Sequence, residues 1–426
     1  MQFILRCKCL RLGVPNNIIS LLFIVLFAAA ANAAEVTEPS KKLTLRTALS
    51  LALQANPSLA VAKREREAIE GVKIQADVRP NPTVSTSIQD TRSDTRQIFL
   101  QINQEIELGD KRNARIEAAD SVYNKATAEL EHQVAEVHAN VVAAFYEVLA
   151  AQARLGLAQS SAEVAALALD AAVKRVKAGK SSPVEETKSK IAESAIKIEF
   201  MQVRSQLNSS RQRLSALWGN ASPAFESAEG EVAVIPLTAS LNALSALLAN
   251  APAINAAKIE VNRREMMTNV ERTKVTPNIT ISAGVVNNQE VGLNQALLGL
   301  TVPIPLSDRN QGNLQEAIAR QYKAQDELIA LENQLQSNLA GQYERLSAAK
   351  QSATLLSTEI LPGAQSAFDA ANKGFTAGKF SFLDVLDAQR TLFQAKSQHI
   401  QVLLEAHQAV AEIERILGDV ISHPEH

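Results

Sequence analysis

Two aspartates near the end of the chain have a spacing that could serve a charge-based function. Asp384 and Asp387 stand three residues apart, shortly after Gly378, so both fall on one face of the start of a helix. The helix dipole stabilises acidic side chains at such a position by about 0.3–1 kcal/mol each. Glu185 holds the matching place after an earlier glycine, Gly179, and Glu186 follows it. Taken alone, the pattern indicates acids that cap or begin a solvated helix.

The other reactive residue types form no catalytic or metal-binding set. His132 and His138 are six residues apart, which places them on different helix faces, and His399 and His407 are separated by more than two turns. The chain has no Gly-Lys-Ser/Thr phosphate loop and no Ser-His-Asp or Cys-His set. We therefore predict no enzyme, no cofactor and no resident metal. Surface positions are expected for all six histidines, the other two being His423 and His426 in the tail.

The composition favours long helices and argues against a nucleic-acid partner. The 43 Lys and Arg residues nearly balance the 45 Asp and Glu residues, so no basic excess is available to bind phosphates. Aromatic residues make up only 4% of the chain, with 16 Gly and 14 Pro. Such a composition is typical of long helices and coiled coils.

The N-terminus has the pattern of an export signal. A basic start is followed by an apolar run from Ile18 to Ala31 and by the small-residue cleavage site Ala31-Asn32-Ala33. We predict a signal peptide over 1–33, and the alternative is an N-terminal membrane anchor. Both cysteines, Cys7 and Cys9, fall inside this segment. The mature chain is therefore not expected to be a lipoprotein, since that would require a cysteine at its N-terminus.

The rest of the chain consists of two halves with similar sequence patterns. Ala178-Gly179-Lys180 returns as Ala377-Gly378-Lys379, and Leu217-Trp218-Gly219 returns as Ile416-Leu417-Gly418, both 199 positions later. Leu108-Gly109-Asp110 matches Leu306-Ser307-Asp308 at an offset of 198. Self-similarity at this length indicates a duplicated half-molecule. We assign the first repeat to 34–220, a linker to 221–240, the second repeat to 241–418 and a tail to 419–426.

Each repeat is predicted to contain a helix, two strands, a very long helix, a tight turn and a returning helix. The long helices are expected over 110–177 and 310–374, where proline and glycine are scarce. The first would extend about 100 Å at 1.5 Å per residue, which implies coiled-coil packing. The returning helices run from Pro183 to Leu217 and from Phe382 to Leu417. The strands are predicted over 83–90, 96–108, 278–286 and 293–306.

The strands have alternating faces that suit either lipid or a soluble core. Val84, Thr86 and Ile88 alternate with Ser85 and Ser87, and the other strands follow the same pattern. Strands of about ten residues with one apolar face match membrane barrels, although a sheet on a soluble core also fits. No apolar stretch after the signal is expected to form a membrane helix. Four strands cannot close a barrel, since closed membrane barrels start at about eight strands, so several copies would have to combine.

The order of these elements, together with the signal peptide, resembles the TolC family of outer-membrane efflux channels. The sharpest match is the segment from Gly378 to Gln389, Gly-Lys-Phe-Ser-Phe-Leu-Asp-Val-Leu-Asp-Ala-Gln, and Val302-Pro303-Ile304-Pro305-Leu306 is a second. The first-half turn, from Ala178 to Thr187, is similar to the CzcC-like heavy-metal branch. The resemblance implies a mainly α fold with membrane strands, assembled as a homotrimer with a 12-stranded barrel and a helical periplasmic tunnel. It also implies a periplasmic adaptor and an inner-membrane pump of the resistance-nodulation-division (RND) type as partners.

The resemblance assigns roles to residues near the two turns. Asp384 and Asp387, with Glu185 as a first-half counterpart, would line the periplasmic aperture and select for cations. The adaptor would dock at four turn residues: Gly179, Lys180, Gly378 and Lys379. Secretion-type relatives close the tunnel through a tyrosine and an arginine, which are replaced here by Phe375 and Phe380. These two phenylalanines are candidate gate residues that cannot make the corresponding hydrogen bonds.

The leading hypothesis is therefore a passive exit duct in the outer membrane, carrying substrates, heavy-metal cations among them, out of a tripartite efflux system. One alternative is the outer-membrane duct of a type I secretion system, against which the two phenylalanines argue. The other is a periplasmic coiled-coil structural or adaptor protein, in which the strands would pack on protein rather than on lipid.

Overall fold

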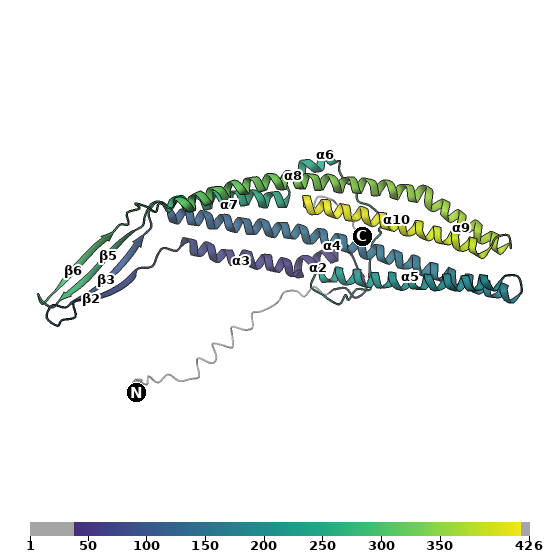
Figure 1. Cartoon of the computed structure of the whole chain (residues 1–426), viewed down its shortest axis with the longest axis horizontal. Coiled ribbons are helices and arrows are strands. Elements are labelled where there is room, and N and C mark those ends of the chain that lie inside the picture. The colour runs from purple at the N-terminus through teal and green to yellow at the C-terminus, as the bar shows by residue number, and fades with distance from the viewer. Residues whose placement is uncertain (1–37, 419–426) are drawn as a thin grey trace, which may run out of the picture. The chain divides into compact units, whose positions relative to one another are not determined.

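The computed structural model describes residues 38–418, apart from the side chain of Phe382 (Figure 1). The predicted signal peptide 1–33, with Cys7 and Cys9, and the tail 419–426, with His423 and His426, lie outside the described residues. Within 39–418, a four-stranded sheet lies at one end of the helices and two tight turns lie at the other (Figure 1).

The first half contains two helices, a strand pair and two further helices in the predicted order. Asn56 divides the first helical region, because it ends one helix and its side chain accepts a hydrogen bond from the Leu59 amide of the next, at 3.1 Å. The bounds of the elements are α2 Leu45–Ala55, α3 Pro57–Asp77, β2 Thr83–Gln89, β3 Gln97–Ile106, α4 Lys111–Lys177 and α5 Pro183–Ala216.

The second half has the same order of elements. The connection to it includes β4 (Ser227–Ala228), which pairs in parallel with β1 (Lys42–Leu43), a small sheet that the sequence pattern did not indicate. The elements that follow are α6 Leu241–Leu247, a 3-10 turn Leu248–Asn250, α7 Pro252–Thr273, β5 Ile279–Asn288, β6 Leu293–Thr301, α8 Gln311–Leu355, a π-helical segment Leu356–Ile360, α9 Leu361–Thr376 and α10 Phe382–Leu417.

The second long helix, predicted over 310–374, is interrupted near Pro362, the proline that the sequence places inside it. The interruption is the π-helical segment Leu356–Ile360, which ends two residues before Pro362. Proline has no amide hydrogen to donate to the preceding turn and its ring crowds the carbonyl four residues earlier. A wider turn at this point relieves that conflict without ending the helix.

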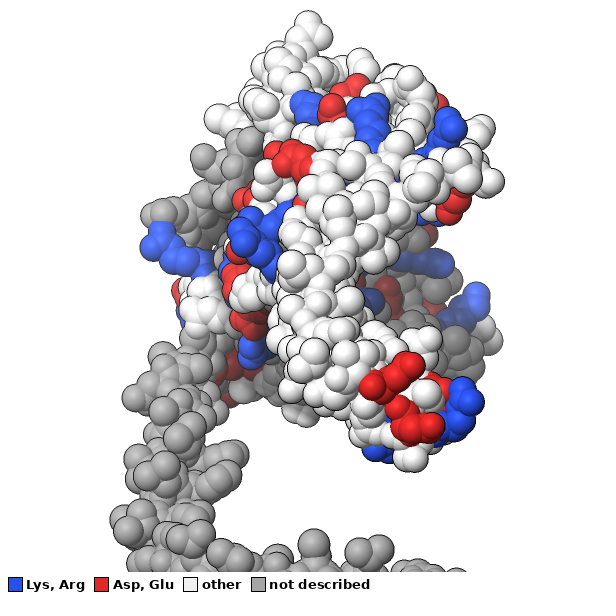
Figure 2. All heavy atoms as spheres, turned by 90° about the vertical axis from the view of Figure 1, so that its left-hand side faces the viewer, with Lys and Arg blue, Asp and Glu red and all other residues white. Residues whose placement is uncertain are grey.

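The four longer strands form one antiparallel sheet in the order β2-β3-β5-β6. The register places Val84, Ile102, Ala283 and Leu298 side by side across the sheet, so apolar residues from all four strands share one face. On the other face, Asn103 accepts a hydrogen bond from the Ser282 hydroxyl at 2.8 Å. The view onto this end of the molecule shows a band of mainly uncharged surface (Figure 2).

The last strand is shorter than predicted. β6 ends at Thr301, whereas the sequence placed the strand over 293–306. Pro303 and Pro305 explain the difference, because neither can donate a backbone hydrogen bond to a neighbouring strand. The apolar side chains beyond Thr301 therefore belong to an extended connection into α8.

Three apolar clusters form the core of the described residues, two large ones and a small one of Ala364, Leu392 and Ala395, and α10 contributes to all of them. Phe145 of α4 and Leu214 of α5 lie in the first cluster, together with Leu404 of α10. Leu339 of α8 and Val410 of α10 lie in the second. A continuous helix that packs into both large clusters fixes the two halves of the chain against each other.

His407 departs from the surface position expected of it, because it is fully buried where the clusters meet. Its ring stacks on Tyr146 of α4 with 3.6 Å between centroids, and its Nε2 lies 2.9 Å from the Val232 carbonyl oxygen. A buried polar ring is tolerated when it is hydrogen-bonded. Burial, followed by the charge of Glu414, raises the pKa of Tyr146 to about 12.

One described helix contradicts the expectation that no further apolar stretch is long enough for a membrane. α4 passes that test by length and composition, and half of the stretch concerned is buried inside the chain. Val141, Val142, Phe145 and Leu149 of this helix belong to the first core cluster. Core packing accounts for the apolar character of the stretch.

The strand-to-helix joints are alike in the two halves. Asp110 and Asn310 both have a left-handed backbone, with φ of 65° and 57°, directly before α4 and α8. The side chain of each accepts a hydrogen bond from the asparagine three residues later, Asn113 or Asn313, at 2.6 Å in both cases. The structural match of Asp110 is therefore Asn310, two residues beyond the Asp308 that the sequence comparison paired with it.

The first joint depends on a glycine. Gly109 has a φ of +72°, and a β-carbon there would lie 2.6 Å from the Cβ of Thr276. We expect Gly109→Ala to destabilise the fold by about 1–2 kcal/mol from the backbone alone, with the collision adding to this. Thermal unfolding in detergent, followed by circular dichroism, measures the loss.

Gly156→Ala is the matched control for Gly109→Ala. Gly156 lies inside α4 with open space around its α-carbon. Alanine should stabilise a helix interior by about 0.5–1 kcal/mol relative to glycine. Equal unfolding temperatures for the two variants would contradict the role given to Gly109.

Candidate functional site

The two turns at the far end from the sheet have the same hydrogen-bond pattern. After α4, the Gly179 amide donates to the Val176 carbonyl at 3.0 Å, and the Lys180 amide donates to the Arg175 carbonyl at 2.9 Å. After α9, the amides of Gly378 and Lys379 donate to the carbonyls of Phe375 and Gly374 at 3.0 and 2.8 Å. Both glycines have a left-handed backbone, with φ of +68° and +74°. Each turn is therefore a Schellman motif, which requires that conformation.

The helices after the turns begin at serine caps. Ser182 accepts a hydrogen bond from the Val184 amide at 3.3 Å at the start of α5. At the start of α10, Ser381 accepts from the Asp384 amide at 3.3 Å, and the Ser381 amide donates to the Asp384 carboxylate at 2.8 Å. This reciprocal pair is a capping box. The start of α10 is thus fixed by more capping hydrogen bonds than the start of α5.

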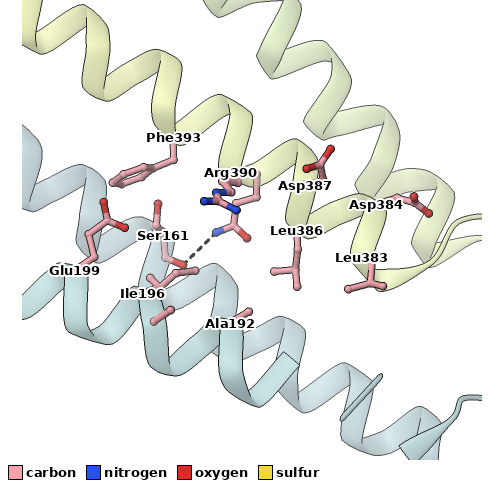
Figure 3. A pocket seen from close by; sticks show the side chains of 12 residues that line it. Ser161, Ala192, Ile196, Glu199, Leu383, Asp384, Leu386, Asp387, Arg390 and Phe393 are labelled. Atoms are coloured by element: carbon pink, nitrogen blue, oxygen red, sulfur yellow. Dashed lines mark hydrogen bonds between the residues drawn. The ribbon is translucent and has the colours of Figure 1, made fainter. Parts of the chain in front are cut away.

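The three predicted aperture acids have different environments. Asp384 is exposed, and hydrogen bonds from the hydroxyl and amide of Ser381 lower the pKa of its carboxyl. Asp387 is also exposed, one turn further along α10. In Figure 3 both aspartates point away from α5, whereas Leu383 and Leu386 point toward it. Glu185 lies half-buried in the first turn of α5. The structure describes a single chain, so their arrangement around an aperture remains a prediction.

A groove of about 700 Å³ separates α10 from the α4–α5 pair near the turns (Figure 3). Gln389 of α10 bridges it by donating to the Ser161 carbonyl of α4 at 3.1 Å. The residues that line the groove are Ser161, Ala192, Ala195, Ile196, Glu199, Leu383, Asp384, Leu386, Asp387, Gln389, Arg390 and Phe393. Both aspartates therefore stand at the rim of a partly apolar groove.

The two candidate gate phenylalanines have different neighbours. The guanidinium of Arg175, in the last turn of α4, lies 4.8 Å from the centroid of the Phe375 ring. Phe380 instead folds back on its own turn. Its ring lies so close to Gly374 that a β-carbon on that residue would collide with it. No pattern in the sequence indicates Arg175 or the hydrogen bond from Gln389 to Ser161. An arginine four residues before a glycine turn gives no sign of its ring partner on a distant helix.

The remaining titratable residues form no metal centre in the part of the chain that the structure describes. His132 lies 3.9 Å from Glu136 on the same helix. His399 is partly buried, and this burial lowers its pKa. With His407 in the core, the described histidines are spread along the helices.

Comparison with known proteins identifies the family. The profile of the family described as "Outer membrane efflux protein" matches two stretches of the chain, 48–220 and 243–419. The cobalt-zinc-cadmium resistance protein CzcC of Cupriavidus metallidurans is 44% identical over 89% of this chain and 91% of its own length. The nickel-cobalt-cadmium resistance protein NccC of Alcaligenes xylosoxydans xylosoxydans is 26% identical over 76% of this chain and 72% of its own length.

Solved structures have the same fold at low sequence identity. The outer-membrane protein VceC of Vibrio cholerae superposes with a TM-score of 0.74 at 20% identity, covering 88% of this chain and 96% of its own. A structure of CusC, described for its folding and transmembrane channel formation, superposes with a TM-score of 0.73 at 17% identity, covering 88% and 92%. The mainly helical fold with its small sheet is thus the fold of TolC-family channels.

The chain belongs to the outer-membrane efflux protein family, as the resemblance predicted. This family consists of efflux proteins rather than enzymes. Membership decides between an outer-membrane channel and a periplasmic coiled-coil adaptor in favour of the channel.

The capping box predicts different effects for the two aspartates. Asp384→Ala removes the acceptor of the Ser381 amide and hydroxyl, so the first turn of α10 should open more often. Amide hydrogen exchange there should become severalfold faster, whereas Asp387→Ala, the matched control, should leave it unchanged. Equal effects of the two substitutions would show that the capping box does not hold the turn.

The capping box also predicts a pH dependence. Hydrogen bonds from Ser381 depress the folded-state pKa of Asp384 below its usual value of 3.8, so the carboxylate stabilises the turn above that pH. The contribution is lost as the pH falls through the folded pKa. Protection of the α10 start against exchange, corrected for the intrinsic rate, should fall at acid pH in the native chain. The Asp384→Ala chain should lack this dependence.

Proposed function

We propose that the chain is the outer-membrane exit duct of a tripartite efflux system that exports divalent heavy-metal cations. The observation that carries the proposal is 44% identity, over 89% of the chain, to a protein named for cobalt, zinc and cadmium resistance. A second relative is named for resistance to nickel, cobalt and cadmium. Both names favour metal export over the alternative of protein secretion.

The duct would be a homotrimer closed by strands from three chains. β2 and β6 are the outer strands of the sheet, and each has a neighbour on only one side within the described residues. Unpaired backbone groups cost several kcal/mol each in lipid, so the edges need partners. β2 and β6 run in opposite directions, so β6 of one chain can pair with β2 of the next in the antiparallel pattern. Three four-stranded sheets give 3 × 4 = 12 strands.

The helical end would face the partners. In this arrangement Asp384, Asp387 and Glu185 surround the periplasmic aperture, and carboxylates from three chains attract cations. The turn residues Gly179, Lys180, Gly378 and Lys379 would be the docking points of a periplasmic adaptor. They are exposed at the end of the helices opposite to the sheet, where an adaptor could reach them.

The duct itself would be passive. An inner-membrane pump of the RND type would supply the energy, and the duct would need no cofactor. The chain would reach the outer membrane after cleavage of the signal peptide 1–33. Alanine at positions 33 and 34 leaves no cysteine for lipid attachment there.

The apolar face of the sheet provides a test of membrane insertion. Leu298 of β6 is 83% exposed in the single chain and lies on the apolar face. Leu298→Arg should prevent stable insertion, because arginine on a lipid-facing strand costs about 2–4 kcal/mol near the bilayer midplane. Outer-membrane fractionation, followed by mass determination of the extracted oligomer, measures the outcome.

Gln295→Arg is the control on the opposite face of the same strand. Gln295 is exposed and would face the lumen, where a charge is tolerated. We expect normal insertion and a mass of three protomers. Loss of insertion in both variants, or in neither, would contradict the assignment of the lipid-facing side.

The aspartates provide a test of the aperture. Asp387→Asn in purified protein should lower cation selectivity in planar bilayers, measured as the reversal potential in a salt gradient. The same substitution should reduce zinc and cobalt tolerance in cells that depend on this duct. Asp326→Asn, which removes an equally exposed charge from α8 far from the turns, should change neither. An unchanged reversal potential with Asp387→Asn would remove this residue from the aperture.

A further inference from the structure

The joint between the sheet and the helices contains two arginines that no neighbouring side chain uses. The joint comprises the stretches 77–82, 105–115, 271–278 and 302–310. Within the described residues, the side chains of Arg79 and Arg309 take part in no hydrogen bond or ion pair, and both residues are exposed. The acidic side chains of the joint all have other partners. These pairs are Asp77 with Arg112, Glu107 with Arg115, Glu271 with Lys274, Glu105 with Asn278, Asp110 with Asn113, and Asp308 with the Asn310 amide.

The remaining cations of the joint are also engaged. Lys111 donates to the carbonyl oxygen of Thr276, and Arg272 donates to the Asn269 side chain at 3.1 Å. Arg79 and Arg309 are therefore the cations of the joint that remain available to an external anion.

A line of exposed apolar side chains leads along β6 toward Arg309. Leu298 and Leu300 are 83% and 65% exposed within the strand. Beyond the strand, Ile304 and Leu306 follow at the same alternation and are 76% and 79% exposed. The exposed apolar surface of the sheet thus continues past Thr301 and ends shortly before Arg309.

The length of β6 sets the depth of this region in the proposed duct. The nine residues of β6, at about 3.3 Å each and tilted by about 40°, span about 23 Å, close to the apolar band of about 25 Å in membrane barrels. The residues that follow Thr301 therefore reach the level of the lipid headgroups on the helix side. A long cationic side chain at that level can reach headgroup phosphates while its stem stays against apolar chains.

The two arginines belong to opposite edges of one sheet and to the same seam between two chains. Arg79 stands four residues before the start of β2, and Arg309 stands eight residues after the end of β6. Both of these strand ends lie on the helix side of the sheet (Figure 1). When β6 of one chain pairs with β2 of the next, as proposed for the duct, the two arginines flank one seam.

We propose that Arg309 of one chain and Arg79 of the next bind the headgroup phosphate of an anionic phospholipid at each seam, on the helix side of the membrane. This inference rests on the proposed duct function, because only neighbouring chains bring the two edges together. A guanidinium presents paired donors that match phosphate oxygens. The acyl chains would lie along Ile304 and Leu306, a contact that a free phosphate ion could not make.

Native mass spectrometry of the purified trimer, delipidated and then titrated with phosphatidylglycerol in a neutral detergent, tests this site. The native trimer should retain phosphatidylglycerol more tightly than phosphatidylcholine, which carries no net charge. Arg309→Gln and Arg79→Gln should each weaken retention about fivefold, the effect of one cation near an anionic lipid surface. Arg204→Gln is the matched control, because it removes an exposed arginine from α5, away from the sheet. It should leave retention unchanged.

Ile304→Ser and inorganic phosphate distinguish a lipid from a free anion. The substitution leaves both guanidinium groups in place but removes apolar contact, so retention of phosphatidylglycerol should fall. Inorganic phosphate at millimolar concentration should not displace the lipid. Displacement by phosphate, together with native retention in Ile304→Ser, would assign the site to a free anion and overturn the lipid.

The outcomes separate the lipid site from the duct. Native retention in both arginine variants, or an equal loss in Arg204→Gln, would overturn the site and leave the duct in place. A native chain that forms no trimer would overturn the proposed function and the site with it. If Arg309→Gln fails to assemble, Arg309→Lys keeps the charge and should retain the lipid nearly as the native trimer does. Complete loss of retention in Arg309→Lys would overturn the role given to charge.

Discussion

The open edges of the four-stranded sheet are the constraint on which the rest of the structure depends. β2 and β6 each have one row of backbone groups without a partner strand among the described residues, and their apolar side chains face away from any core of this chain. Lipid offers no hydrogen bonds to such groups. A sheet of this kind is stable in a membrane only when its edges meet other edges. In the proposed trimer, the helices would leave the sheet in a direction that allows copies of the chain to stand side by side.

Much of this arrangement can be predicted from the sequence, and particular residues show why. Prolines and glycines mark the ends of elements, so Gly179 and Gly378 located both turns and Pro183 located the start of α5. Alternating apolar residues predicted the four strands because the strand period is two. The same local signals misjudged the last strand, which stops at Thr301 before its prolines, whereas at Pro362 a π-helical segment absorbs the proline without ending the helix.

The candidate site was predictable only in its local part. The serine-aspartate spacing of Ser381 and Asp384 encodes a capping box that needs nothing beyond one helix turn. The partners of Phe375, Ser161 and His407 come from helices hundreds of positions away, and no periodic pattern announces them. His407 illustrates the limit, because a histidine on an apolar helix face has no sequence feature that reveals a stacking tyrosine on α4. Single-residue burial depends on how whole helices are placed.

The π-helical segment has a consequence for how the two ends of the second long helix are matched to α10. Buried residues of α8 recur every seven positions at Leu339, Leu346 and Ala353, and those of α9 at Ala364 and Ala371, with eleven positions between the series. α10 runs unbroken alongside both. The interruption therefore changes the register in which the second long helix packs against the uninterrupted α10. Near the turns, α9 packs on α10 through Ala364 in a register different from the one that α8 uses in the core.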